Sequence, residues 1–273
     1  MYISRIKLFN WKNFHDCEVA LSERCFIVGA NATGKSNFLD VIRFMRDIVK
    51  QGGGLQAAVA LRGGLKKIRC LAARQRTEVC IDVDICENGQ SSPKWRYSLE
   101  LSNKGGGIRK PYPLVNREIA YNYYTKETVL DRKYNSKGED SETLKFTHLE
   151  QPTANAEFRE IKEVFQTTEY LNVIPQFVRD ADSVMLSSGM EDYFGRNFME
   201  RLSLLNTAKR NKYLKIINEV LLTAVPQLEN LSFVKDEKGV PHIEAKYNHW
   251  RAKGSKQNEK MFSDGTIRLI GFL

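Results

Sequence analysis

Apolar positions at the start of the chain follow a two-residue repeat and then a helical one. Polar and apolar residues alternate over 3–9 and 16–20, which predicts two short strands. Residues 25–28 form an unbroken apolar run, the pattern of a strand buried on both faces. Over 35–50 apolar residues recur at helical spacing, and glycines at 52–54 end that pattern. The predicted order is two strands, a buried strand, a loop and a helix.

The middle of the chain has the pattern of an antiparallel sheet. Residues 78–86, 94–101, 117–124 and 127–132 alternate or are rich in β-branched and aromatic side chains, with Gly and Pro turns between them. These four runs predict an antiparallel meander. Residues 134–141 are polar and predict an exposed loop.

The last part of the chain changes to helices and returns to strands. Residues 155–225 have a helical pattern, clearest over 194–206 and 211–224. Residues 231–234 and 240–247 then have strand character, and the final residues predict the start of a helix. The fold class predicted is mixed α/β, with an antiparallel subdomain and a helical insertion.

The length of 273 residues exceeds what one hydrophobic core usually supports. We therefore expect an N-terminal lobe over 1–150, a helical insertion over 151–230 and a return to the first lobe over 231–273. No apolar run approaches the ~20 residues of a membrane-spanning helix, and the N-terminus lacks a secretory signal. A cytoplasmic protein with no membrane partner is expected.

Composition adds little about chemistry. The formal net charge of +9 favours polyanionic partners, but basic residues are spread along the chain, so a solvated basic surface is an equal alternative. The four histidines lack ligand spacing, so a zinc site is not expected. An odd number of cysteines without a C-x-x-C pair predicts reduced core residues: Cys17, Cys25, Cys70, Cys80 and Cys86.

The strongest chemical motif lies between the predicted buried strand and the first helix. It has the pattern G-x-x-x-x-G-K-[ST], in which glycines let several backbone N–H groups point at a phosphate at the helix N-terminus. Lys35 should reach the β- and γ-phosphates of ATP, and the Ser36 hydroxyl should bind Mg²⁺. A glycine turn that binds nothing is the alternative, yet chance gives this pattern in only about 1% of such chains. The expected ATP-binding residues are Gly29, Ala30, Asn31, Ala32, Thr33, Gly34, Lys35, Ser36 and Asn37.

Four stretches of the chain together resemble a known family. They are 8–14 (Leu-Phe-Asn-Trp-Lys-Asn-Phe), 29–37, 172–179 and 262–266. In this order they resemble the ABC-type ATPase heads of the RecF, SMC and OLD lineage, and most of all the compact bacterial AAA-type, RecF-like ATPases. Many of those belong to phage-defence or DNA-repair systems. The resemblance implies a P-loop NTPase head.

The resemblance also assigns a role to a late tetrad, Ser263, Asp264, Gly265 and Thr266. In such heads this signature motif faces the γ-phosphate of a nucleotide held by a second subunit. A homodimer that sandwiches two ATP molecules is therefore implied. A Ser hydroxyl and Gly N–H groups at a helix N-terminus suit an anion. The alternative is an ordinary N-capped helix.

Hydrolysis in these ATPases needs a buried strand that ends in Asp-Glu. Residues 79–84 alternate and so do not fit, and 231–237 are interrupted by Lys235 and precede the signature. We therefore expect the sequence to stop before that Walker-B strand, as a fragment, a processed product or half of a split head. For a glutamine that contacts Mg²⁺ and water, Gln75 is the candidate, and an exposed polar residue is its alternative.

Three functions remain open from the sequence. The first is an ATP-driven switch that regulates DNA or an effector, without the coiled coil of an SMC tether, since 151–230 is too short for one. The second is the ATPase part of an OLD-type nuclease whose metal-binding TOPRIM domain lies elsewhere. The third is a scaffold that binds ATP without cleaving it. A small-molecule kinase is a distant fourth.

Overall fold

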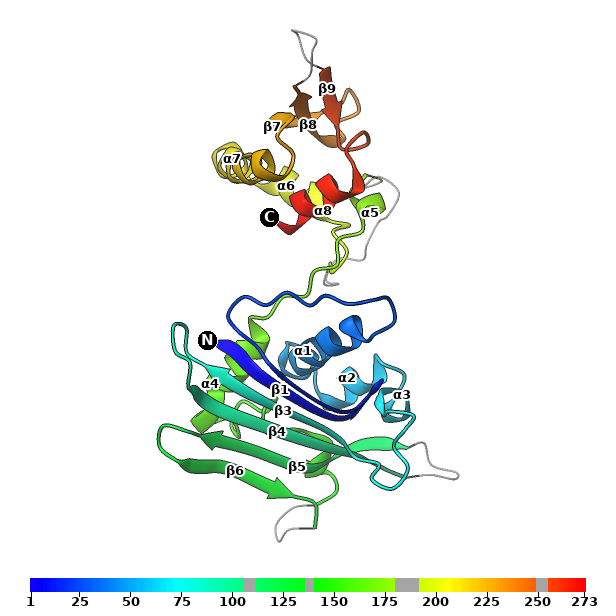
Figure 1. Ribbon diagram of the computed structural model, residues 1–273, viewed down its shortest axis with the longest axis vertical. Helices are drawn as coiled ribbons and strands as arrows, with labels where there is room; N and C mark the ends of the chain where they lie inside the picture. The colour runs from blue at the N-terminus through cyan, green and yellow to red at the C-terminus, as the bar shows by residue number, and fades with distance from the viewer. Residues whose placement is uncertain (106–110, 136–139, 180–191, 249–254) are drawn as a thin grey trace. The chain divides into compact units, whose positions relative to one another are not determined.

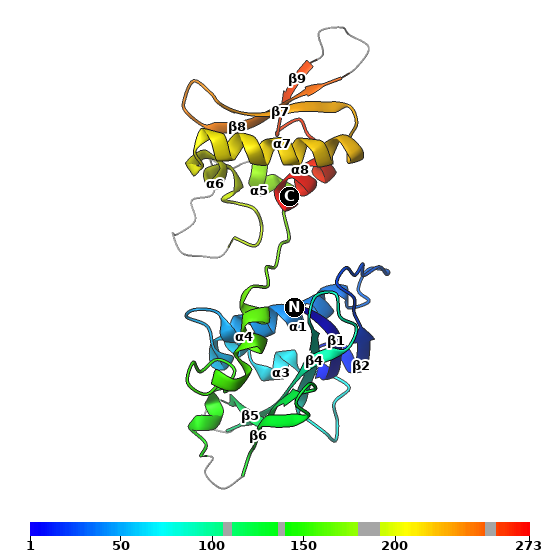
Figure 2. The same cartoon turned by 90° about the vertical axis from the view of Figure 1, so that its left-hand side faces the viewer.

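The computed structural model describes residues 1–105, 111–135, 140–179, 192–248 and 255–273. Over these residues the chain divides into two compact units, Met1–Glu169 and Tyr170–Leu273. Each unit is drawn with its own sheet and helices in Figures 1 and 2. No described helix is both long and apolar enough to cross a membrane.

The first unit is built on an antiparallel six-stranded sheet with the order β2-β1-β3-β4-β5-β6. The predicted meander and the two predicted N-terminal strands are confirmed, with ends that differ by a few residues. The strands are β1 (Tyr2–Trp11), β2 (Phe14–Ala20), β3 (Val79–Cys86), β4 (Pro93–Lys104), β5 (Tyr112–Asn122) and β6 (Glu127–Lys133). Part of the predicted loop at 134–141 lies outside the described residues.

One face of this sheet carries the core of the unit. Side chains of a strand alternate between its two faces, and Ile6, Ile81 and Tyr97 are among the apolar side chains that point into the core. In Figure 1 the first helices lie along the same face of the sheet. The helices of the unit are α1 (Lys35–Val49), α2 (Leu55–Ala60), α3 (Leu65–Ile68), α4 (Arg159–Gln166) and the short 3₁₀ helices η1 (Thr143–Lys145) and η2 (Ala156–Phe158).

The buried carboxylate of Glu118 connects β5 and β6 to the segment at 148–149 that follows the sheet. Glu118 on β5 is fully buried and accepts hydrogen bonds from the Tyr97 hydroxyl (2.7 Å) and from the backbone N–H groups of His148 and Leu149. Arg132 on β6 lies 3.3 Å from the same carboxylate. Because its oxygens are paired, this charge is tolerated inside the core.

The predicted buried strand at 25–28 is wrong. These residues adopt no regular structure, and Phe26 and Val28 are 83% and 88% exposed. The physical reason lies in the sheet order, because β1 already pairs with β2 on one side and β3 on the other. Within the described residues no strand pairs with 25–28. Cys25 is therefore exposed rather than in the core, whereas Cys70 and Cys86 are buried as expected.

The second unit packs helices against a three-stranded antiparallel sheet with the order β7-β8-β9. Leu214 and Ile217 of the long helix and Ile267 and Ile270 of the last helix contribute to its core. The predicted helices around 194–206 and 211–224 and the strands around 231–247 are confirmed. The elements are α5 (Pro175–Arg179), α6 (Phe198–Leu204), α7 (Thr207–Ala224), β7 (Leu228–Lys235), β8 (Pro241–Tyr247), β9 (Ser255–Asn258) and α8 (Asp264–Phe272).

Candidate nucleotide-binding site

The glycine-rich loop runs directly into the first turn of α1, and its backbone needs glycine at one point. Gly34 is the N-cap of α1 and has φ +103°, a left-handed conformation that side chains disfavour. A Cβ atom there would lie 2.3 Å from Nδ2 of Asn13. Both the backbone conformation and the packing therefore select glycine at this position.

The ammonium group of Lys35 lies inside the curve of the loop. Its Nζ donates to the carbonyl oxygens of Gly29 (2.8 Å) and Ala30 (2.6 Å). The Thr33 hydroxyl also donates to the Ala30 oxygen, at 2.9 Å, and so tightens the same turn. A single positive charge is thus held where the loop curls back on itself, the position in which an anionic group would meet it.

The start of α1 fits a phosphate and a hard cation. The first turn contains no acidic side chain, so the positive end of the helix dipole is not neutralised. Ser36 is exposed in that turn, and a hydroxyl is the kind of oxygen ligand that Mg²⁺ takes beside phosphates. The residues present therefore fit Mg²⁺-ATP, with backbone N–H groups and Lys35 for the phosphates and Ser36 for the metal.

The turn between β1 and β2 supports the loop from behind. Asn37 donates to Oδ1 of Asn13 at 2.8 Å, and Asn13 donates to the Thr33 carbonyl at 3.4 Å. The indole N–H of Trp11, itself fully buried, donates to the Asn37 carbonyl at 2.8 Å. The sequence indicated 8–14 only as part of a family likeness. Nothing in its spacing pointed to Asn13 as a loop support.

An ion-pair network links α1 to the segments packed around it. Asp40 lies 2.6 Å from Lys12 Nζ and 2.8 Å from the Arg62 guanidinium. Arg62 also pairs with Asp47, which lies two turns further along α1. Burial by itself would raise the pKa of Asp40, but hydrogen bonds from Arg62 and Lys12 outweigh it and hold that pKa below its ordinary value. The network joins α1 to the turn before β2 and to the end of α2.

The late tetrad forms the N-terminus of α8 in the second unit. Ser263 caps the helix by accepting from the Thr266 N–H, and its hydroxyl lies 2.8 Å from the Thr266 hydroxyl. Arg179 pairs with Asp264 at 2.7 Å and donates to the Phe262 carbonyl. Ser263, Asp264 and Gly265 are exposed, and beside Gly265 a Cβ would meet only the Ser263 hydroxyl within 4 Å.

Other residues considered from the sequence have different surroundings. Gln75 is exposed before β3 and makes no hydrogen bond with any described residue. Asp84, in the middle of the antiparallel sheet, is paired with Arg96 and Arg5. Asp236 closes the hairpin between β7 and β8 by accepting from backbone N–H groups of its own turn.

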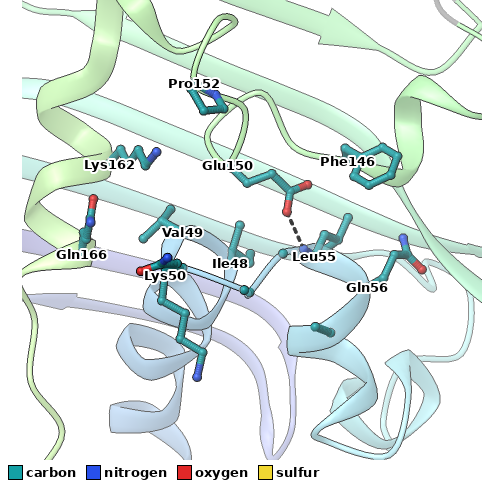
Figure 3. Close-up of a pocket in the computed structure, with 15 residues that line it drawn as sticks. Ile48, Val49, Lys50, Leu55, Gln56, Phe146, Glu150, Pro152, Lys162 and Gln166 are labelled. Carbon is teal, nitrogen blue, oxygen red and sulfur yellow. Dashed lines mark hydrogen bonds between the residues drawn. The ribbon is translucent and has the colours of Figure 1, made fainter. Parts of the chain in front are cut away.

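A large open cavity of the first unit lies elsewhere, beside the glycine turn after α1. It measures about 680 Å³, and Figure 3 shows Glu150 directed from one wall toward the backbone of the other. The carboxylate accepts from the N–H groups of Leu55 and Thr147, both at 2.7 Å. Burial, with a smaller contribution from Glu118, nevertheless raises the pKa of Glu150 to about 7.

A glycine-rich loop at the start of a helix, followed by Lys-Ser, on a mixed α/β fold defines a P-loop ATPase domain. The particular family follows from the family models. Residues 25–273 match the model described as "AAA domain, putative AbiEii toxin, Type IV TA system", and residues 3–45 match the "P-loop containing region of AAA domain". The chain belongs to this AAA-domain family.

Solved structures agree on the fold. The chain is similar to the structure titled "Crystal structure of the SmcHead bound to the C-winged helix domain of ScpA", with a TM-score of 0.52 and 13% identity. The match covers all of this chain and 76% of the other. The predicted fold class, a P-loop NTPase head with an antiparallel sheet, is confirmed. No curated protein matches the chain.

Proposed function

We propose that this chain is a cytoplasmic ATP-dependent switch that binds Mg²⁺-ATP at residues 29–37. The observation that carries the proposal is the position of Lys35 Nζ inside the loop at the start of α1. Lys35 would bind the β- and γ-phosphates, backbone N–H groups of the loop would bind the same oxygens, and Ser36 would hold Mg²⁺. Asn13 would keep the loop in shape.

The second half of the proposed site comes from another copy of the chain. The exposed N-terminus of α8, with the Ser263 hydroxyl and the Gly265 N–H, would face the γ-phosphate of a nucleotide on the partner. Arg179 supports this proposal because it fixes the first turn of α8 through Asp264. The closing of two heads around ATP would then regulate a DNA-related or defence effector.

Of the two alternatives to a hydrolysing switch that the sequence left open, one has support in the structure. Within the described residues, the two Asp-containing segments considered for Walker B are engaged in a sheet ion pair and a hairpin turn. A head that binds ATP as a ligand-gated scaffold therefore remains a candidate. An OLD-type nuclease subunit, with TOPRIM carboxylates outside this chain, is the other.

The test is nucleotide binding and phosphate release by the full chain and by Lys35→Ala. Removing a charged hydrogen-bonding group is expected to weaken Mg²⁺-ATP binding by about tenfold or more, measured by calorimetry. Lys133→Ala, an exposed lysine on β6, is the matched control and should bind normally. Equal affinities of Lys35→Ala and the parent chain would overturn the proposal.

Phosphate release separates the alternatives. Release that is lost in Lys35→Ala supports the switch, and tight binding without release supports the scaffold. Dimerisation is measured by light scattering with and without ATP. An ATP-induced dimer that Ser263→Ala fails to form is the expected result, and a dimer unaffected by Ser263→Ala would remove the tetrad from the proposed site.

A further inference from the structure

One surface segment departs from the even spread of basic residues along the chain. Residues 66–76, here called the basic segment, comprise most of α3 and the chain that leads to β3. They contain no Asp or Glu, and their five cationic side chains are Lys66, Lys67, Arg69, Arg74 and Arg76. Five positive charges in eleven positions are a local excess that the whole-chain composition does not reveal.

Four of the five cationic residues of the basic segment are exposed, and Arg69 is half-buried. In α3 the apolar residues Leu65 and Ile68 are buried, which leaves Lys66 and Lys67 exposed on the other side of the turn. Arg74 is exposed in the following chain. Leu71, also in this segment, is 99% exposed.

Most of these charges are not neutralised by the protein. Within the described part of the chain, Lys66, Lys67, Arg69 and Arg74 have no carboxylate partner within 4 Å. Arg76 alone pairs, with Glu100 at 3.1 Å and Glu78 at 3.9 Å. The open face of the sheet differs, because cations there have carboxylate partners, as in the pairs Arg117–Asp131 and Arg96–Asp84. The basic segment therefore has a positive potential of its own.

The basic segment is also held in place at both ends. The Cys70 N–H donates to the Asn10 carbonyl at 2.9 Å, and the Lys12 N–H donates to the Ile68 carbonyl. Further along, the side chain of Asn10 donates to the Arg76 carbonyl at 2.8 Å. Fixed backbone reduces the entropy lost when its side chains bind a ligand.

We propose that the basic segment binds the phosphate backbone of double-stranded DNA. Clustered, unpaired Lys and Arg side chains supply the sequence-independent attraction that such contacts need. The segment has no aromatic residue, so it lacks the stacking platform that proteins use for single-stranded bases. Binding at this surface requires no bound nucleotide, so the proposal does not rest on the proposed ATP switch.

The experiment measures fluorescence anisotropy of a short labelled DNA duplex with the full chain, without nucleotide, between about 50 and 200 mM salt. The variant carries Lys66→Ala, Lys67→Ala and Arg74→Ala. Its affinity at the lowest salt is expected to fall about tenfold or more, and the log–log salt slope should become shallower by about 2 to 3. Lys209→Ala, Lys212→Ala and Lys215→Ala, three exposed lysines on α7, form the charge-matched control.

Retained ATP binding and an unchanged melting temperature show that the triple variant is folded. Should the triple variant unfold, the single substitution Arg74→Glu, between α3 and β3, is used in its place. It is also expected to lower the affinity for the duplex. The proposal is overturned when the parent chain does not bind the duplex, or when the α7 control loses as much affinity. Tighter binding of single-stranded DNA or of double-stranded RNA than of duplex DNA also overturns it.

Discussion

At the scale of single residues, Glu150 has two opposing influences on its charge. Two backbone N–H groups bind its carboxylate and favour ionisation, while burial and the nearby Glu118 oppose it. The pKa of about 7 means that burial prevails. In the unfolded chain the same carboxyl titrates near 4.5, so the folded state binds the proton more tightly.

This pKa predicts a loss of stability as the pH rises. The contribution of Glu150 is fully present below about pH 4.5 and is lost as the pH passes through about 7, because the folded pKa is raised. Between pH 5 and 8 the expected decrease, discounted for partial exposure, is about 1 to 2 kcal/mol in the free energy of unfolding. Urea unfolding across this range measures it.

The control for this prediction is the difference between variants. Glu150→Gln should unfold with a flatter pH profile than the parent, whatever its absolute stability, since a Gln amide binds no proton here. Glu163→Gln, an exposed position on α4, should keep the parent profile. Parallel profiles for Glu150→Gln and the parent would contradict the assignment of the shift to Glu150.

How far single residues could be predicted depends on whether they belong to a repeat or motif. Gly34, Lys35 and Ser36 have a fixed spacing that exists because loop geometry requires it, and the sequence displays that spacing directly. Asn13 has no such signal, because its partners Thr33 and Asn37 are about twenty residues away and become neighbours only after β1 and β2 pair. What these residues bind stays a prediction.

At the scale of elements, the turn between β1 and β2 contacts both the phosphate loop and the basic segment. Its Asn13 holds the phosphate loop, and the adjacent Lys12 N–H holds the basic segment through Ile68. A change in the loop on ATP binding would therefore reach the basic segment through two residues. The path consists of two hydrogen-bonded contacts joined by the peptide bond between Lys12 and Asn13.

From this path we expect DNA affinity to depend on ATP in the parent chain, with a coupling of roughly fivefold or more. Asn13→Ala should bring the ratio of the DNA affinities with and without ATP toward one. It should leave DNA binding in the absence of nucleotide intact. Anisotropy titrations with and without saturating Mg²⁺-ATP measure both quantities. As a control, Asn122→Ala, at the end of β5, should leave the ratio of the two affinities unchanged. An Asn13→Ala variant with the same ratio as the parent chain would rule out this path.

The elements themselves were predicted well wherever one face of a strand is buried. β4 and the first half of β3 alternate buried and partly exposed side chains because one sheet face meets the helices, and the matching alternation of apolar and polar residues is visible in the sequence. The run at 25–28 was not predicted correctly. Its composition matches a strand buried on both faces, but composition cannot supply the neighbouring strands that such burial requires.

At the scale of the whole molecule, each compact unit has its own hydrophobic core. The glycine-rich loop and the basic segment both belong to residues 1–169. This fragment is therefore expected to unfold cooperatively and to bind Mg²⁺-ATP and duplex DNA as the full chain does. It should not form the ATP-induced dimer, because it lacks Ser263 to Thr266.

Circular dichroism melts, calorimetry and light scattering on the fragment and the full chain test this division. A broad, non-cooperative melt would show that the first unit depends on the second. An ATP-induced dimer of the fragment would show that the contact between copies lies within residues 1–169, and the role proposed for α8 would be wrong.

The exposed run at 25–28 has a consequence for the behaviour of the protein in solution. Phe26 and Val28 are almost fully accessible, and the backbone beside them pairs with no described strand. A short apolar stretch with free backbone groups is a template on which strands of other chains can add, the first step toward aggregation. The sequence just ahead of the phosphate loop is thus a point at which this chain is vulnerable to aggregation, and Phe26→Lys would act there as a gatekeeper.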